Sequence, residues 1–288
     1  VDDIDYSTTN WTDIDPASNF VADEAECDAL FTAIPDSNFE QALIDLGIDT
    51  NPTPDGQVPT ANISGVTSLI VPSKNIADLT GIEDFTALSF LRCENNQLTS
   101  IDVSNNTALT VLNCNNNQLS SLNVSNNSAL QSLNCGINQL TNLDVSANPA
   151  LDYLNCILNQ LTSLDVSQNI ALTDLRGQKN QLTSLDVSAN PALIVFYCND
   201  NQLTSLDVRN GNNTNITTFN ATTNPDLTCI YVDDIDYSTT NWTDIDPAST
   251  FLEDETECDA NYTAIPDSNF EQALIDLGYD TAPIDGQV

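Results

Sequence analysis

The sequence contains no histidine and no methionine among its 288 residues, and only five lysines and arginines stand against 42 acidic residues. Without histidine, the usual general base and the usual partner of a catalytic serine are missing, so enzyme chemistry is hard to assemble. A net charge of −37 disfavours nucleic acid and anionic membranes as partners. The chain also lacks a glycine-rich phosphate loop and a hydrophobic run long enough to span a membrane. We therefore expect a non-enzymatic protein without a membrane-inserted segment.

What the chain has instead is a 21-residue repeat, present six times between Leu88 and Val208 in the form LxxLxCxxNQLTSLDVSxNPA. Each copy has two similar halves, because L-x-x-L-x-C-x-x-N is followed by L-x-x-L-x-V-x-x-N. Apolar residues two positions apart, such as Leu112 and Cys114, are typical of a short strand with one inward face. A fixed period of this length indicates stacked coils. We predict two parallel ladders of strands around a narrow core, with almost no helix between residues 62 and 227.

An asparagine follows each predicted strand. Asparagine tolerates left-handed backbone and bonds to nearby main chain, as a recurring tight turn requires, so we predict structural roles for these residues. The asparagines after the first strand are Asn96, Asn117, Asn138, Asn159, Asn180, Asn201 and Asn224, and those after the second are Asn106, Asn127, Asn148, Asn169 and Asn190.

These copies resemble the leucine-rich repeats of bacterial cell-surface proteins, specifically the short nested type common in Bacteroidetes. The resemblance covers about residues 34–258. It implies a mainly β fold, grouped by convention with the α/β leucine-rich-repeat proteins, in which parallel coils form a solenoid closed by a cap at each end. It implies little about the ligand, because leucine-rich repeats serve many partners.

A second and longer repeat is visible at the two ends of the chain. Residues 1–50 and 232–281 are nearly identical, with seven differences. Because the chain also lacks methionine and begins without a signal peptide, we expect a segment of a longer protein built as a tandem array. The predicted parts are the C-terminal cap of a preceding unit (1–30), an N-terminal cap helix (31–58), the solenoid (59–227), its C-terminal cap (228–260) and the cap helix of the next unit (261–288).

Both caps have recognisable patterns. Ser37 to Glu40 form a capping-box motif, and Phe39, Leu43 and Leu46 lie on one helical face before Gly47, which predicts an amphipathic helix over the first coil. After the last coil, an alternating apolar pattern predicts strand and turn over the open end of the core, formed by Ile230, Val232, Ile235, Tyr237 and Trp242. Aromatic residues of the junction, namely Phe251, Tyr262 and Phe270, are expected to contact the neighbouring unit.

The eight cysteines fall into two classes. Five share one inward position of the coils, interrupted by Gly177, and neighbours there would lie about 4.8 Å apart, farther than the roughly 3.8 Å that a disulfide prefers between Cβ atoms. We expect buried free thiols, with a metal ladder as the alternative. Cys229 and Cys258 bracket the C-terminal cap and are expected to form a disulfide, which indicates an oxidising, extracellular setting. The five ladder residues are Cys93, Cys114, Cys135, Cys156 and Cys198.

A row of aspartates occupies the outward position of the second strand. Stacked carboxylates repel one another, and Ca²⁺ would relieve that repulsion, whereas the alternative is a solvated polar face. The row consists of Asp102, Asp144, Asp165, Asp186 and Asp207, interrupted by Asn123, and the acidic C-terminal cap is a second candidate with Asp233, Asp234, Asp236, Asp244 and Asp246.

The outward face of the first strand is mostly asparagine and glutamine, with Tyr197, Arg92, Arg176 and Lys179 as exceptions. Such a face could bind glycans or simply keep a sheet hydrated. We therefore carry two hypotheses: a non-enzymatic structural or adhesive repeat unit of a long bacterial surface protein or filament, and a leucine-rich-repeat module that recognises a protein or glycan. The expected partners are neighbouring units and surface proteins or glycans, at the cell surface.

Overall fold

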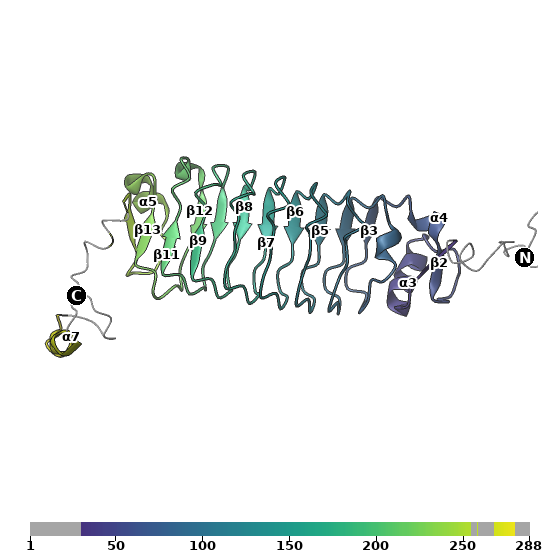
Figure 1. Ribbon diagram of the computed structural model, residues 1–288, viewed down its shortest axis with the longest axis horizontal. Helices are drawn as coiled ribbons and strands as arrows, with labels where there is room; N and C mark the ends of the chain where they lie inside the picture. Colours follow the sequence, from purple (N-terminus) through teal and green to yellow (C-terminus); the bar gives the residue numbers. More distant parts are fainter. Residues whose placement is uncertain (1–29, 255–257, 259–267, 280–288) are drawn as a thin grey trace, which may run out of the picture.

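The computed structural model describes residues 30–254, 258 and 268–279, and residues 30–254 form an elongated solenoid of stacked coils (Figure 1). Eight parallel strands line one side, in the spatial order β12-β10-β8-β7-β6-β5-β4-β3, and we call them the long sheet. The fold class predicted from the repeats is confirmed. The strands are β3 (Ser68–Ile70), β4 (Phe90–Arg92), β5 (Val111–Asn113), β6 (Ser132–Asn134), β7 (Tyr153–Asn155), β8 (Asp174–Arg176), β10 (Val195–Tyr197) and β12 (Thr218–Asn220).

Every strand of the long sheet turns its central residue into the core. Leu112 of β5 pairs with Leu91 of β4 and Leu133 of β6, and all three side chains are fully buried. Because side chains alternate across a strand, the first and third residues of each strand lie on the outer face. The inward leucines of successive coils join into one continuous core that runs the length of the solenoid.

The second ladder is shorter than predicted. Four parallel strands form it, in the order β14-β13-β11-β9, and they belong to the last coils and the C-terminal cap. In the earlier coils the equivalent segments are not strands, and hollows open between them, one of which is lined by Leu122 and Asp144. Leu206 of β11 lies in a backbone ladder with Leu185 and Ile230, whereas the segment that contains Leu122 pairs with no neighbouring strand. The strands are β9 (Ser184–Asp186), β11 (Ser205–Asp207), β13 (Cys229–Tyr231) and β14 (Thr250–Leu252).

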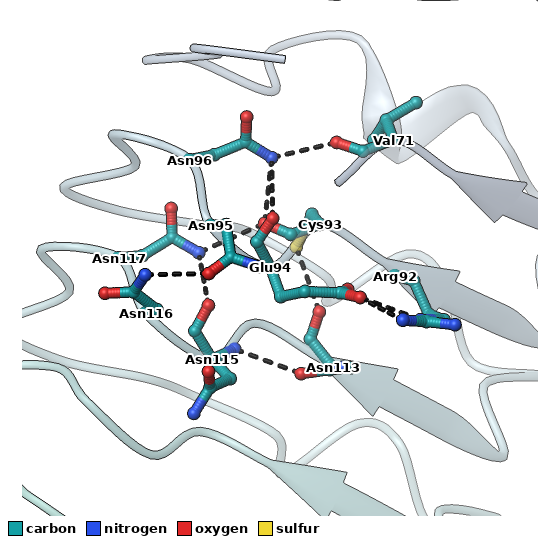
Figure 2. A network of polar contacts seen from close by, with 10 residues as sticks. All are labelled: Val71, Arg92, Cys93, Glu94, Asn95, Asn96, Asn113, Asn115, Asn116 and Asn117. Atoms are coloured by element: carbon teal, nitrogen blue, oxygen red, sulfur yellow. Dashed lines mark hydrogen bonds and ion pairs between the residues drawn. The ribbon is translucent and has the colours of Figure 1, made fainter. Parts of the chain in front are cut away.

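Buried asparagines join each coil to the one before it (Figure 2). The Asn117 Nδ2 donates to the carbonyl oxygen of Cys93 in the preceding coil at 3.1 Å. It also donates to the carbonyl oxygen of Cys114 in its own coil at 3.0 Å. Its Oδ1 accepts a hydrogen bond from the backbone N–H of Leu98 at 3.0 Å. One side chain thus satisfies main-chain groups of two coils that would otherwise be buried without partners. The same contacts recur at Asn138, Asn159, Asn180, Asn201 and Asn224.

The left-handed backbone expected at these asparagines lies one residue earlier. Asn116 has φ +53° and Ile137 has φ +52°, and each directly precedes a ladder asparagine. The ladder asparagines are absent from the described non-glycine residues with positive φ. The reason is geometric: the ladder side chain must point inward to bond across coils, so the more exposed residue before it makes the turn.

The second set of asparagines, at the opposite bend, also donates to the preceding coil, but the buried Oδ1 atoms of Asn106, Asn127, Asn148, Asn169 and Asn190 accept no hydrogen bond. Asn127 is fully buried, and its Nδ2 donates to the carbonyl oxygens of Val103 at 3.0 Å and Asn106 at 2.9 Å. Where the insertion RNGNNTN breaks the period, Asn210 takes over this role with a 3.0 Å bond to the carbonyl of Asn190. A short 3₁₀ helix, η2 (Asn213–Asn215), then absorbs the extra residues.

The N-terminal cap places helix α3 (Ser37–Asp45) over the first coil, where Phe39 and Leu43 are fully buried and the Phe39 ring stacks on Phe85 at 6.4 Å. A further turn of 3₁₀ helix, η1 (Ile82–Asp84), precedes Phe85. An antiparallel pair that the sequence did not predict, β1 (Phe31–Ala33) and β2 (Gln57–Pro59), flanks α3 and leads into the short helix α4 (Thr60–Ile63).

Two details of the predicted cap helix are wrong. The N-cap is Asp36, whose carboxylate accepts from the N–H groups of Asn38 and Phe39. Glu40 does not close a capping box, because its buried carboxylate accepts from the N–H groups of Asp55 and Gly56 and so fixes the loop before β2. Leu46 is 49% exposed, since the helix ends before that residue can reach the core.

The C-terminal cap is built on Trp242. Its ring stacks on Phe219 at 4.3 Å, and its indole Nε1 donates to the carbonyl of Ile216 at 2.9 Å, so it covers the end of the core while keeping its polar atom bonded. The strand-and-turn prediction is wrong for residues 235–241, which form helix α5 (Ile235–Asn241). Asp234 starts this helix by accepting from the N–H of Tyr237, a capping signal that the apolar alternation obscured.

The predicted disulfide between Cys229 and Cys258 is confirmed, with the two Cα atoms 6.0 Å apart. Replacing Cys229 with Ser should lower the free energy of unfolding by about 3 kcal/mol, because the bridge closes a loop of nearly 30 residues. Urea unfolding of both proteins measures this effect. Thiol counting on the unfolded, non-reduced wild type should find six thiols, including Cys27, which lies outside the described residues, and a count near zero would contradict this assignment.

Helix α7 (Ser268–Asp276) has the same sequence, SNFEQALID, as α3. None of the helices in the described ranges is long and apolar enough to cross a lipid bilayer.

Candidate binding face

The outer face of the long sheet carries two rows of side chains, one on each side of the central buried leucines. The structure adds a row that the sequence analysis did not include, because the strands begin one residue before the inward leucine. All members of both rows in β4 to β12 are partly exposed. The added row is Ser68, Phe90, Val111, Ser132, Tyr153, Asp174, Val195 and Thr218, and the other row, which was expected from Arg92 to Tyr197, is Ile70, Arg92, Asn113, Asn134, Asn155, Arg176, Tyr197 and Asn220.

Arg176 is the centre of a cluster that spans three neighbouring strands. Its Nε and Nη2 donate to the two carboxylate oxygens of Asp174, each at 2.9 Å. Its guanidinium carbon lies 5.6 Å from the ring centre of Tyr153 on β7 and 5.8 Å from that of Tyr197 on β10. The hydrogen bonds that Arg176 donates to Asp174 raise the pKa of Arg176 above its ordinary value, so the side chain stays cationic. We call Tyr153, Asp174, Arg176 and Tyr197 the tyrosine–arginine cluster.

The cluster is suited to recognition rather than to reaction. A two-point Arg–carboxylate contact fixes the plane of the guanidinium, and the two rings hold it from either side with cation–π attraction. The tyrosine side chains have few rotatable bonds, so they lose little conformational entropy on contact with a partner. They also present both apolar and hydrogen-bonding surface. No histidine exists to accept a proton, and Asp174 is already committed to Arg176.

Three of the four other basic residues pair with carboxylates of this chain. Arg92 pairs with Glu94 on the long sheet, and Lys74 pairs with Asp45 at 2.9 Å. On the short second ladder, Arg209 pairs with Asp207 and lies 5.0 Å from the ring centre of Tyr231. This second arrangement repeats part of the tyrosine–arginine cluster on another side of the solenoid, and it provides a matched control.

The ladder cysteines are free and fully buried. The Sγ of Cys93 donates to the carbonyl of Asn113 at 3.5 Å, and Cys135, Cys156 and Cys198 make equivalent bonds to the next coil. Burial raises the pKa of Cys114 and of Cys156 to about 12, so the thiols stay protonated at neutral pH. Since metal ligation and nucleophilic attack both need the thiolate, these residues act as small core groups.

The aspartate row is bonded locally. The Oδ1 of Asp144 accepts from the N–H of Ser146 at 2.9 Å, and its neighbours in the row do the same with the residue two positions later. Hydrogen bonds from Ser104 and Ser146, chiefly from their side chains, lower the pKa values of Asp102 and Asp144. In the described part of the chain, no three carboxylate, thiol or imidazole groups come together as a metal site. The calcium hypothesis therefore gains no support from the geometry.

The predicted inter-unit residues have different surroundings. Phe251 of β14 is 7% exposed and lies edge-on to Trp242 at 5.8 Å, so it belongs to the core of its own cap, and the inter-unit prediction is wrong for it. Tyr262 lies outside the described residues. Phe270 on α7 is 55% exposed.

Together, stacked coils of about 21 residues, a leucine core and a parallel sheet along one side define a leucine-rich-repeat solenoid. The structure is similar to the functional domain of InlJ from Listeria monocytogenes, described as including a cysteine ladder, with a TM-score of 0.56 and 32% identity over 70% of this chain and 52% of that one. The chain therefore spans about half the length of that domain. It is also similar to internalin C2 of Listeria monocytogenes, with a TM-score of 0.57 and 18% identity over 77% of this chain and 98% of that one.

The InlJ domain is thus described with a cysteine ladder, as is seen in this chain, whereas the second match, at its lower identity, shows the fold alone. No protein-family model matches the chain, and no curated protein matches it.

Proposed function

We propose that the protein is a non-enzymatic adhesion module that acts outside the cell and binds a protein partner through the outer face of its long sheet. The observation that carries this proposal is the tyrosine–arginine cluster, which places two tyrosines and a fixed arginine together on the outer face of the long sheet. Tyrosine and arginine are enriched among residues that dominate binding energy in protein interfaces. The Cys229–Cys258 disulfide supports an oxidising, extracellular location.

Binding is tested by panning a phage-displayed random-peptide library on the full chain and measuring the selected clones on variants. The double variant Tyr153→Ala/Tyr197→Ala should weaken binding at least about tenfold, because it removes both aromatic contacts and keeps the Arg176–Asp174 pair. Tyr231→Ala is the matched control, since it removes a tyrosine beside an arginine away from the long sheet. Equal binding to the double variant and the wild type would contradict the proposal.

A second role, as a structural unit in a tandem array, is favoured by the two identical cap helices. In α3, Phe39 is fully buried against the first coil, whereas the equivalent Phe270 of α7 is 55% exposed. A following solenoid would bury Phe270 in the same way, and α7 would then be the N-terminal cap helix of that solenoid. Small-angle scattering of a two-unit protein tests this role, and a broad distribution of inter-unit angles would argue against a stiff filament.

A further inference from the structure

Two adjacent coils carry apolar residues where a polar residue would serve the fold better. Ile137 and Leu158 occupy the left-handed position before a ladder asparagine, with φ +52° and +54°, and are 41% and 42% exposed. The same position holds Asn95 and Asn116 in the two coils before, and Lys179 and Asp200 in the two coils after.

Both residues carry a backbone cost at this position. L-residues other than asparagine and glycine are disfavoured in the left-handed region, and a β-branched side chain such as that of Ile137 is disfavoured most. The asparagines at this position also join neighbouring coils, because the Asn116 Nδ2 donates to Asn95 Oδ1 at 2.7 Å. Ile137 and Leu158 give up that bond and leave apolar surface in water. Such a local cost, borne at two successive coils, indicates a role outside folding.

A third apolar side chain makes this patch continuous with the long-sheet face. A Cβ placed on Gly136 would lie 2.6 Å from Cγ2 of Ile157, so Ile157 covers the space that the glycine leaves open. The N–H of Ile137 donates to the carbonyl of Ile157 at 2.7 Å, which places the two residues side by side. Ile157 lies on the same strand edge as Asn155 of β7, next to the tyrosine–arginine cluster. We call Ile137, Ile157 and Leu158 the bend patch.

We infer that the bend patch is the apolar anchor point for a protein partner that inserts one apolar side chain flanked by lysines or arginines. This inference rests on the proposed binding role of the long-sheet face. The partner's basic character follows from charge: this chain carries −37, and four of its five cations are already paired with its own carboxylates. A basic partner is attracted by the field of the whole molecule, while the apolar patch supplies a desolvated centre for the interface. The amide and tyrosine surface beside the patch forms the polar rim.

The variant Ile137→Asn/Leu158→Asn tests this inference with the same phage-displayed random-peptide library as probe. Peptides selected on the wild type should carry an apolar residue flanked by Lys or Arg, and they should bind the variant at least about tenfold more weakly. Their affinity for the wild type should also fall when salt is raised from about 0.15 M to 0.5 M. The variant itself should unfold at a higher temperature than the wild type, because asparagine tolerates the left-handed backbone.

Ile170→Asn is the matched control, because Ile170 is 62% exposed and lies at the opposite bend without positive φ. It should leave the affinity unchanged. A bend-patch variant that unfolds at a lower temperature would show that the two residues are retained for packing, and the inference would be wrong. Full affinity for this variant, with loss on Tyr153→Ala/Tyr197→Ala, would overturn the inference and leave the proposed function standing. Failure to select any peptide would overturn both, and patch-dependent binding to a glycan array instead would replace the protein partner.

Discussion

Between pH 9 and about pH 12 the folded protein should lose stability steeply, by up to about 7 kcal/mol per pH unit, because of its five buried thiols. The ordinary pKa of a cysteine is 9.0, and burial raises the pKa of Cys114 and Cys156 to about 12 and that of Cys93 and Cys135 well above 9. Burial also raises the pKa of Cys198. The native state therefore keeps protons that the unfolded state releases, so unfolding is favoured as pH rises. Each thiol contributes about 1.4 kcal/mol per pH unit in this window and nothing below it.

Urea unfolding at a series of pH values from 7 to 11, with the disulfide intact, measures this dependence. The variant Cys135→Ala should lose about one-fifth of the alkaline slope, because one of five coupled protons is removed. This comparison separates the contribution of the thiols to the slope from the contributions of tyrosines, lysines and the general negative charge, which both proteins share. A slope that is the same in both proteins would mean that the ladder thiols ionise freely in the folded state.

Replacing Asn138 with Ala should lower the free energy of unfolding by about 3–5 kcal/mol. The change removes an Nδ2 that donates to the carbonyls of Cys114 and Cys135 and an Oδ1 that accepts from the N–H of Leu119 at 3.0 Å. Buried groups that lose their partners cost about 1–3 kcal/mol each. Chemical denaturation measures the effect, with Asn142→Ala as the control at an exposed position four residues later.

The control should change stability by less than about 0.5 kcal/mol. If both variants unfolded at the same urea concentration, the ladder would be contributing little, and the coils would be held by the leucine core alone.

The repeat period predicted the solenoid, its parallel long sheet and the inward cysteines because each coil is a short, self-similar segment whose faces follow from alternation. Properties that depend on contacts between coils were not predictable in this way. The coils of Leu122 and Leu206 have the same sequence pattern in the second half, but only the segment of Leu206 pairs with its neighbours as a strand. Helix α5 was missed because the apolar alternation up to Ile235 hid the capping signal of Asp234.

The candidate site also combines residues that the sequence indicated with residues that only the structure revealed. Arg176 and Tyr197 stood out in the sequence as exceptions on an amide-rich face, but Tyr153 and Asp174 did not, because strand register decides which residue lies beside which. The sequence could have indicated them, because side chains alternate across a strand and the residue before each inward leucine therefore lies on the outer face. Likewise, Ile137 and Leu158 could be seen to break the repeat, but their left-handed backbone and exposure required the structure.

The claim that the long-sheet face is the binding surface is tested most directly by hydroxyl-radical footprinting of the full chain, with and without the tightest peptide from the library. Tyr153 and Tyr197 are partly exposed, as is Tyr231 away from the long sheet, so the three side chains report on different faces in one experiment. We expect the peptide to reduce oxidation of Tyr153 and Tyr197 and to leave oxidation of Tyr231 unchanged. Protection of Tyr231 with undiminished oxidation of Tyr153 and Tyr197 would contradict the account.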